Sequence, residues 1–125
     1  MKTGRPVIAL IEDEPSVRIA LAKGIDSASY NVLSAANGAE GLAMLENPQV
    51  DIAVVDIMLP GRLDGVTLVR EAKRRNPDLR VVFMSGRPPP EGVDLSTLGE
   101  FIQKPSRLHD LLFVIDRLLR EKSAG

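Results

Sequence analysis

Side chains suited to phosphate chemistry follow four short apolar runs of the sequence. In chain order they are Glu12, Asp13, Glu14, Asp56, Ser85 and Lys104. Carboxylates held close together repel one another, so they persist only if a cation joins them or if some stay protonated. Oxygen ligands without His or Cys favour Mg²⁺, with Mn²⁺ as the alternative, over zinc. These residue types therefore indicate a divalent-cation site.

Asp56 is the natural acceptor of a phosphoryl group in this set. An aspartate can act as a nucleophile and form an aspartyl-phosphate. A lysine ammonium binds phosphate oxygens as a point charge, and a serine hydroxyl can donate a hydrogen bond to one. Lys104 and a metal ion would together neutralise charge on the transferring group. Because Asp56 ends the middle strand of the predicted set, the other groups can converge on it.

Each residue also has a simpler structural interpretation. Asp13 or Glu14 could cap a helix. Ser85 could belong to a turn with Gly86, and Lys104 could precede a helix that begins near Ser106. The arrival of these side chains at four separate strand ends favours a common site.

Apolar periodicity alternates between strands and helices. The predicted strands cover residues 6–11, 30–35, 50–56, 80–84 and 100–103. Helices are predicted from Pro15, from Asn37-Gly38, from Asp64-Gly65 and from Leu108, with a weaker candidate over 93–98. This order predicts an α/β fold with a doubly wound parallel sheet covered on both faces. Ligands of such sheets bind at the carboxyl ends of the strands.

Composition limits the classes of function. The 125 residues suit a single domain over 1–125, with its core over about 6–120. The net charge of -1 gives no reason to expect direct binding to nucleic acid or to a membrane surface. Cysteine is absent, which excludes thiolate metal sites. The apolar runs are too short for a membrane span or a signal peptide, so we expect a cytoplasmic protein.

Four stretches together resemble the receiver domains of two-component response regulators. They are ALIEDEPSVR, VVDIMLPG, VVFMSG and FIQKP. The resemblance implies a flavodoxin-like sheet of five strands in the order 2-1-3-4-5, with five helices. It also implies that a histidine kinase or a histidine phosphotransfer protein donates the phosphoryl group in the presence of Mg²⁺, and that the domain is not an enzyme beyond its own phosphotransfer and slow dephosphorylation.

The resemblance also assigns roles to single residues. Asp56 resembles the phosphoacceptor, and Lys104 the lysine that contacts the phosphate. Ser85 and Phe101 resemble the switch pair, and Pro105 the cis-proline. The implied metal ligands are Glu12, Asp13, Asp56 and the backbone carbonyl of Met58.

The sequence departs from the family pattern at three places, and each departure predicts a local difference in structure. The loop Pro60–Gly65 has one residue more than is usual, which could shift the rim of the site. Pro88, Pro89 and Pro90 stand where the fourth helix should begin, so that helix should be short or irregular. Phe101 replaces the more usual Tyr and lacks its hydroxyl.

Other interpretations stay open at this stage. The chain could be a receiver excised from a hybrid histidine kinase. A haloacid-dehalogenase-like phosphatase would need Asp-x-Asp after the first strand, where Glu12-Asp13-Glu14 stands. A flavin-binding domain would need a Gly-rich phosphate loop after the first strand. A receiver that is never phosphorylated would not need the complete set of acidic residues, Ser85 and Lys104.

Overall fold

The computed structural model describes residues 3–104 and 106–124. The strands are β1 (Val7–Ile11), β2 (Asn31–Ala35), β3 (Val50–Asp56), β4 (Arg80–Ser85) and β5 (Glu100–Gln103). The helices are α1 (Pro15–Ser27), α2 (Gly38–Met44), α3 (Gly65–Arg75) and α4 (Leu108–Ala124), with a short 3₁₀ helix, η1 (Leu95–Thr97). Each predicted strand is confirmed to within one residue at either end.

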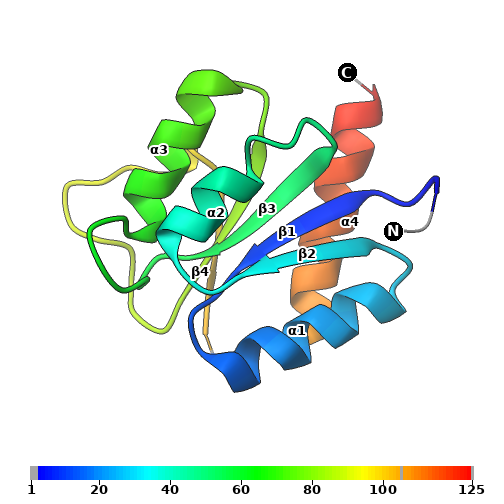
Figure 1. Ribbon diagram of the computed structural model, residues 1–125, viewed down its shortest axis with the longest axis horizontal. Helices are drawn as coiled ribbons and strands as arrows, with labels where there is room; N and C mark the ends of the chain where they lie inside the picture. The colour runs from blue at the N-terminus through cyan, green and yellow to red at the C-terminus, as the bar shows by residue number, and fades with distance from the viewer. Residues whose placement is uncertain (1–2, 105, 125) are drawn as a thin grey trace.

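All neighbouring strands are parallel, and their order in the sheet is β2-β1-β3-β4-β5. The predicted order is therefore confirmed. Helices α2 and α3 cover one face of the sheet, and α1 and α4 cover the other (Figure 1). Strand β3 lies in the centre, so its carboxyl end is surrounded by the ends of β1 and β4.

Alternate residues of the central strands feed two separate cores. Ala53 and Val55 of β3 point to the side of α2 and α3, whereas Ile52 and Val54 point to the side of α1 and α4. Successive side chains of a strand point to opposite faces, and a parallel sheet covered on both sides needs apolar residues on each. This explains why β3 is apolar over Ile52–Val55, the stretch that leads directly to Asp56.

The predicted helix starts are confirmed by their local chemistry. Pro15 occupies the first turn of α1, where a missing N–H costs nothing. The Asn37 side chain accepts a hydrogen bond from the Glu40 N–H at the start of α2, and Asp64 accepts one from the Thr67 N–H at the start of α3. The Asp64 cap ends the long loop after β3.

The expected count of five helices is wrong. The described residues contain four α-helices, and only the single 3₁₀ turn of η1 lies between β4 and β5. Pro88, Pro89 and Pro90 lack amide donors and disfavour helical geometry in the residues before them, so the chain after β4 forms exposed bends and a turn instead of a helix. The helix that was expected to be short or irregular is therefore replaced by bends and this single 3₁₀ turn.

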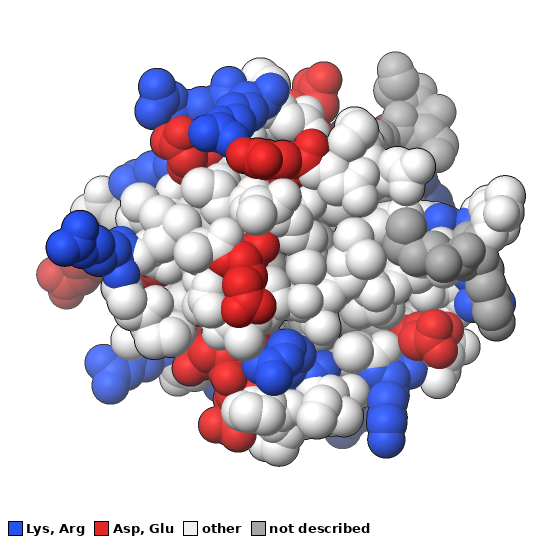
Figure 2. Space-filling view, viewed as in Figure 1, with Lys and Arg blue, Asp and Glu red and all other residues white. Residues whose placement is uncertain are grey.

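Charged side chains of both signs lie next to one another on the face seen in Figure 2. Near the end of α3, Arg74 and Arg75 pair with Glu71, and Arg75 also pairs with Glu46 beyond α2. Exposed pairs of this kind contribute little to stability. They do prevent the basic end of α3 from forming a continuous cationic field.

We predict that Gly65→Ala destabilises the domain and disturbs the end of β3. A Cβ at position 65 would overlap the carbonyl oxygen of Asp56 and would lie 2.7 Å from Ile57 Cα. Relieving such overpacking costs about 1–3 kcal/mol, which urea unfolding would measure. Gly86→Ala is the control, because a Cβ there has open space and should leave the midpoint nearly unchanged. Equal stability of both variants would contradict the close approach.

Candidate functional site

The site lies where β1, β3, β4 and β5 end at one edge of the sheet. Asp56 is the last residue of β3 and pairs in register with Met84, one residue before Ser85. Glu12 directly follows β1. The side chains of Glu12, Asp56 and Ser85 are all buried, with residue exposures of 2%, 8% and 1%. Three polar residues are thus held inside an otherwise apolar sheet edge.

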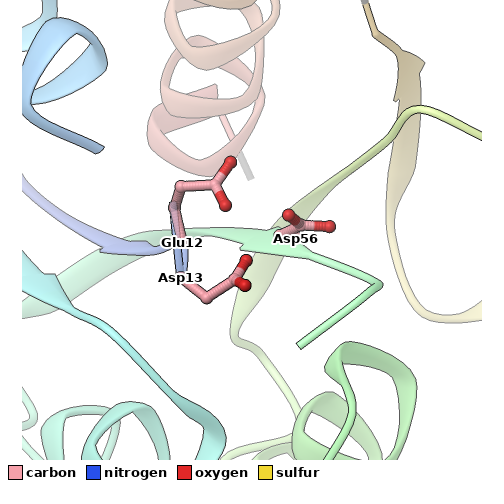
Figure 3. A group of neighbouring side chains, drawn as sticks. All are labelled: Glu12, Asp13 and Asp56. Carbon is pink, nitrogen blue, oxygen red and sulfur yellow. The ribbon is translucent and has the colours of Figure 1, made fainter. Parts of the chain in front are cut away.

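Three carboxylates form a compact cluster at this edge. Glu12, Asp13 and Asp56 each offer a carboxylate oxygen, and these oxygens lie within 4.8 Å of one another. Figure 3 shows Glu12 and Asp13 at the end of β1 facing Asp56 at the end of β3. Asp13 is exposed and the other two are buried, so the cluster opens to solvent on the side of Asp13.

Lys104 supplies the positive charge next to the cluster. Its Nζ pairs with Glu12 Oε1 and lies 3.2 Å from Asp56 Oδ2. The Lys104 N–H donates to the Ser85 carbonyl oxygen at 2.7 Å, which continues the pairing of β4 with β5 for one more residue. The extended sheet ladder therefore determines where the ammonium group can reach.

Burial and charge change the acid–base properties of this group. The pKa of Glu12 is raised to about 7, chiefly by burial and also by the neighbouring Asp56 carboxylate, while the hydrogen bond from Lys104 opposes both effects. Burial by itself lowers the pKa of Lys104, but Glu12 and Asp56 together raise it above its ordinary value. Lys104 therefore stays cationic, whereas ionising Glu12 in this buried position costs free energy.

Backbone amides also hold the site. The Met58 N–H donates to Asp56 Oδ1 at 2.9 Å, and the Arg87 N–H donates to Ser85 Oγ at 3.1 Å. The Glu14 N–H donates to Glu12 Oε2 at 3.2 Å. Each polar side chain is thus bound by the loop that follows its own strand.

Sequence reasoning missed one residue that shapes the site. Arg18, in the first turns of α1, donates from Nη1 to the carbonyl oxygens of Glu12 at 2.9 Å and Asp13 at 3.3 Å. It fixes the backbone that carries two of the three carboxylates. Arg18 lies one helical turn after Glu14, but no pattern in the sequence distinguishes this contact from a solvated arginine.

The remaining expected residues lie as follows. Phe101 of β5 is half-buried, pairs in register with Phe83 and packs against the core on the side of α2 and α3. Met58 lies two residues after Asp56, and the residue is 52% exposed. Pro105 lies outside the described residues, so the expectation of a cis bond there stays a prediction.

The donor set fits a hard divalent cation. It consists of carboxylate oxygens without imidazole or thiolate, and one face of it is open to solvent. Such ligands suit Mg²⁺, which keeps several water molecules when it binds to carboxylates.

A family model described as the response regulator receiver domain matches residues 8–116. The chain belongs to this family. The receiver domain is a signalling domain of two-component systems and not a classical enzyme. The match decides for this family over the phosphatase and flavin-binding alternatives.

Individual relatives agree with this assignment. The response regulator receiver protein CpdR of Brucella abortus is 31% identical over 90% of this chain and 95% of its own length. The sensor kinase CckA of the same organism is 31% identical over 96% of this receiver domain, which spans only 13% of the kinase.

Solved structures share the fold. A CheY-like receiver domain from Methanospirillum hungatei superposes with a TM-score of 0.87 at 26% identity, covering 98% of this chain and 100% of its own. The receiver domain of the hybrid histidine kinase CckA gives 0.77 at 30% identity, covering 90% and 98%. Within the described residues, we find no helix with the length and apolar character needed to span a membrane.

We predict that Lys104→Met lowers the free energy of unfolding by about 2 kcal/mol, because it leaves two buried carboxylates without their cation. Urea unfolding measures the change. Adding Glu12→Gln to this variant should recover part of the loss, since it removes one of the uncompensated charges. Arg107→Met, which removes an exposed cation three residues away, should leave stability unchanged. A loss that the second substitution does not reduce would contradict the charge balance described here.

Proposed function

We propose that this receiver domain accepts a phosphoryl group on Asp56 from a histidine kinase or a histidine phosphotransfer protein. The observation that carries the proposal is the buried Asp56 carboxylate, which lies 3.2 Å from the Lys104 ammonium and belongs to an acidic cluster that opens to solvent at Asp13. Burial among apolar residues holds the carboxylate at a fixed position, and the open side gives a donor access to it.

In the proposed step, a carboxylate oxygen of Asp56 attacks the phosphorus of the donor phosphohistidine. A P–O bond forms and the P–N bond breaks, so that the donor imidazole leaves with the electron pair and takes up a proton. Lys104 is placed to contact an oxygen of the transferred group, since its Nζ already lies beside Asp56 Oδ2. The Met58 N–H holds Asp56 Oδ1 and orients the carboxylate.

The carboxylates of Glu12, Asp13 and Asp56, with the backbone carbonyl of Met58, would hold Mg²⁺. When bound, Mg²⁺ supplies positive charge that offsets the negative charge on the phosphoryl oxygens. Arg18 keeps the Glu12 and Asp13 backbone in place for this purpose. The domain performs the transfer and a slow hydrolysis itself and needs no further catalytic group.

Phosphorylation would then switch the surface through Ser85 and Phe101. The Ser85 hydroxyl is buried at the site edge, where it can turn to a phosphoryl oxygen. Phe101, half-buried beside Phe83, would move further inward into the space that Ser85 leaves. The charge on Asp56 thereby biases a two-state surface that a downstream protein recognises.

We predict that Asp56→Asn abolishes acid-labile labelling by acetyl phosphate with Mg²⁺, because the amide cannot act as the nucleophile. Labelling is measured by intact-protein mass or by a phosphate-affinity gel. Asp78→Asn, which changes an exposed aspartate beyond the end of α3, should label like the parent. Undiminished labelling of Asp56→Asn would contradict the assignment of Asp56 as the acceptor.

We predict that Asp13→Asn weakens Mg²⁺ binding by at least about tenfold, since it removes the solvent-facing ligand of the cluster. Isothermal titration of the unphosphorylated domain with Mg²⁺ measures this directly. Glu14→Gln is the matched control, because the neighbouring Glu14 is exposed and lies outside the cluster. The assignment of the metal ligands fails if both variants bind Mg²⁺ as the parent does.

A further inference from the structure

A groove of about 350 Å³ lies beside the candidate site. One wall is the loop after β3, with Met58 and Leu59, together with Val66 and Arg70 of α3. The other wall is the connection after β4, with Pro90 and Val93. The groove therefore separates the segments that follow Asp56 and Ser85.

The groove exists because the connection after β4 forms no helix before η1. Residues 86–92 are exposed, and the three consecutive prolines among them lack the amide donors that a helix would need. Met58 at the rim is 52% exposed, although Leu59 next to it is buried. An exposed methionine above an apolar floor is typical of surfaces that adapt to a protein ligand.

The cationic side chain of the groove is available to pair with an acidic residue of a ligand. Arg70 is exposed and has no acidic partner among the described residues. The Asp64 carboxylate also lines the groove, but it is held at the start of α3, where it accepts the hydrogen bond from the Thr67 N–H. The volume is at the lower end of the range of small-molecule sites, and it suits a few side chains of a short peptide.

We propose that this groove binds a short peptide segment of a partner protein, which inserts apolar side chains and pairs an acidic residue with Arg70. This inference rests on the proposed function, because it makes the groove the surface that phosphorylation of Asp56 controls.

Two hydrogen bonds connect the groove to the site. The Met58 N–H donates to Asp56 Oδ1, and the Arg87 N–H, three residues before Pro90, donates to Ser85 Oγ. Phosphorylation converts the Asp56 carboxylate into an acyl phosphate, whose oxygens are weaker acceptors, and it draws the Ser85 hydroxyl toward the phosphoryl group. Both contacts change together, so the connection can close over a bound peptide. We expect the phosphorylated domain to bind the peptide at least about fivefold more tightly.

The test uses a phage-displayed library of random dodecapeptides, panned on the domain kept phosphorylated with acetyl phosphate and Mg²⁺. A fluorescein-labelled copy of the most enriched peptide is then titrated by fluorescence anisotropy. The expected peptide combines apolar and acidic residues. Thr67→Trp, which fills the groove from an exposed position, and Arg70→Glu should each weaken binding about tenfold.

Lys23→Glu is the matched control. It reverses an exposed charge on α1, on the opposite face of the sheet, and should leave peptide affinity unchanged. Thermal unfolding of each variant verifies that it folds. If Thr67→Trp is unstable, the exposed Arg70→Glu alone decides the result.

Several outcomes would overturn the inference. One is the absence of an enriched peptide, and another is equal peptide affinity of Arg70→Glu and the parent. A third is a phosphorylation-dependent dimer that Thr67→Trp abolishes, because it would assign the groove to a second copy of the chain. The phosphorylated fraction is measured in parallel by intact mass. Normal phosphorylation with the same peptide affinity in both states overturns this inference alone, whereas a domain that does not become phosphorylated overturns the proposed function together with it.

Discussion

The ammonium group of Lys104 lies between two carboxylates that would otherwise repel each other inside an apolar sheet edge. It pairs with Glu12 and lies 3.2 Å from Asp56 Oδ2, although these residues are 92 and 48 positions away in the sequence. Three clustered carboxylates still outnumber this one cation. The remaining negative charge, together with the raised pKa of Glu12, makes the cluster costly by itself and receptive to a divalent ion.

The parallel sheet makes this convergence possible. Strands β1, β3 and β4 are buried by separate cores on both faces, so their carboxyl ends are fixed relative to one another. The loops beyond these ends carry both buried residues, such as Ile57 and Leu59, and exposed ones, such as Met58. The hydrogen bonds from Met58 and Arg87 attach two such loops to Asp56 and Ser85, which links a change of charge at the site to the groove between the loops.

Much of the arrangement could be predicted from the sequence, because short apolar strands and helix caps are local signals. The strand that ends on Asp56, the cap at Asp64 and the start of α1 at Pro15 all belong to this class. The helix count was wrong because the prolines after Ser85 remove one helix outright rather than shorten it. Three features could not be predicted, since they depend on side-chain directions that periodicity does not specify. They are the contacts of Arg18 with the backbone, the pairing of Lys104 with two carboxylates at once, and the groove.

The central claim is that the buried carboxylate of Asp56, and not one of its acidic neighbours, carries the phosphoryl group. Borohydride reduction converts an aspartyl phosphate into homoserine, which peptide mass spectrometry locates to a single residue. After treatment with acetyl phosphate and Mg²⁺, the account predicts homoserine at position 56 and unmodified Glu12 and Asp13. Reduction at position 13, or no reduced residue in a domain that has gained the mass of a phosphoryl group, would contradict it.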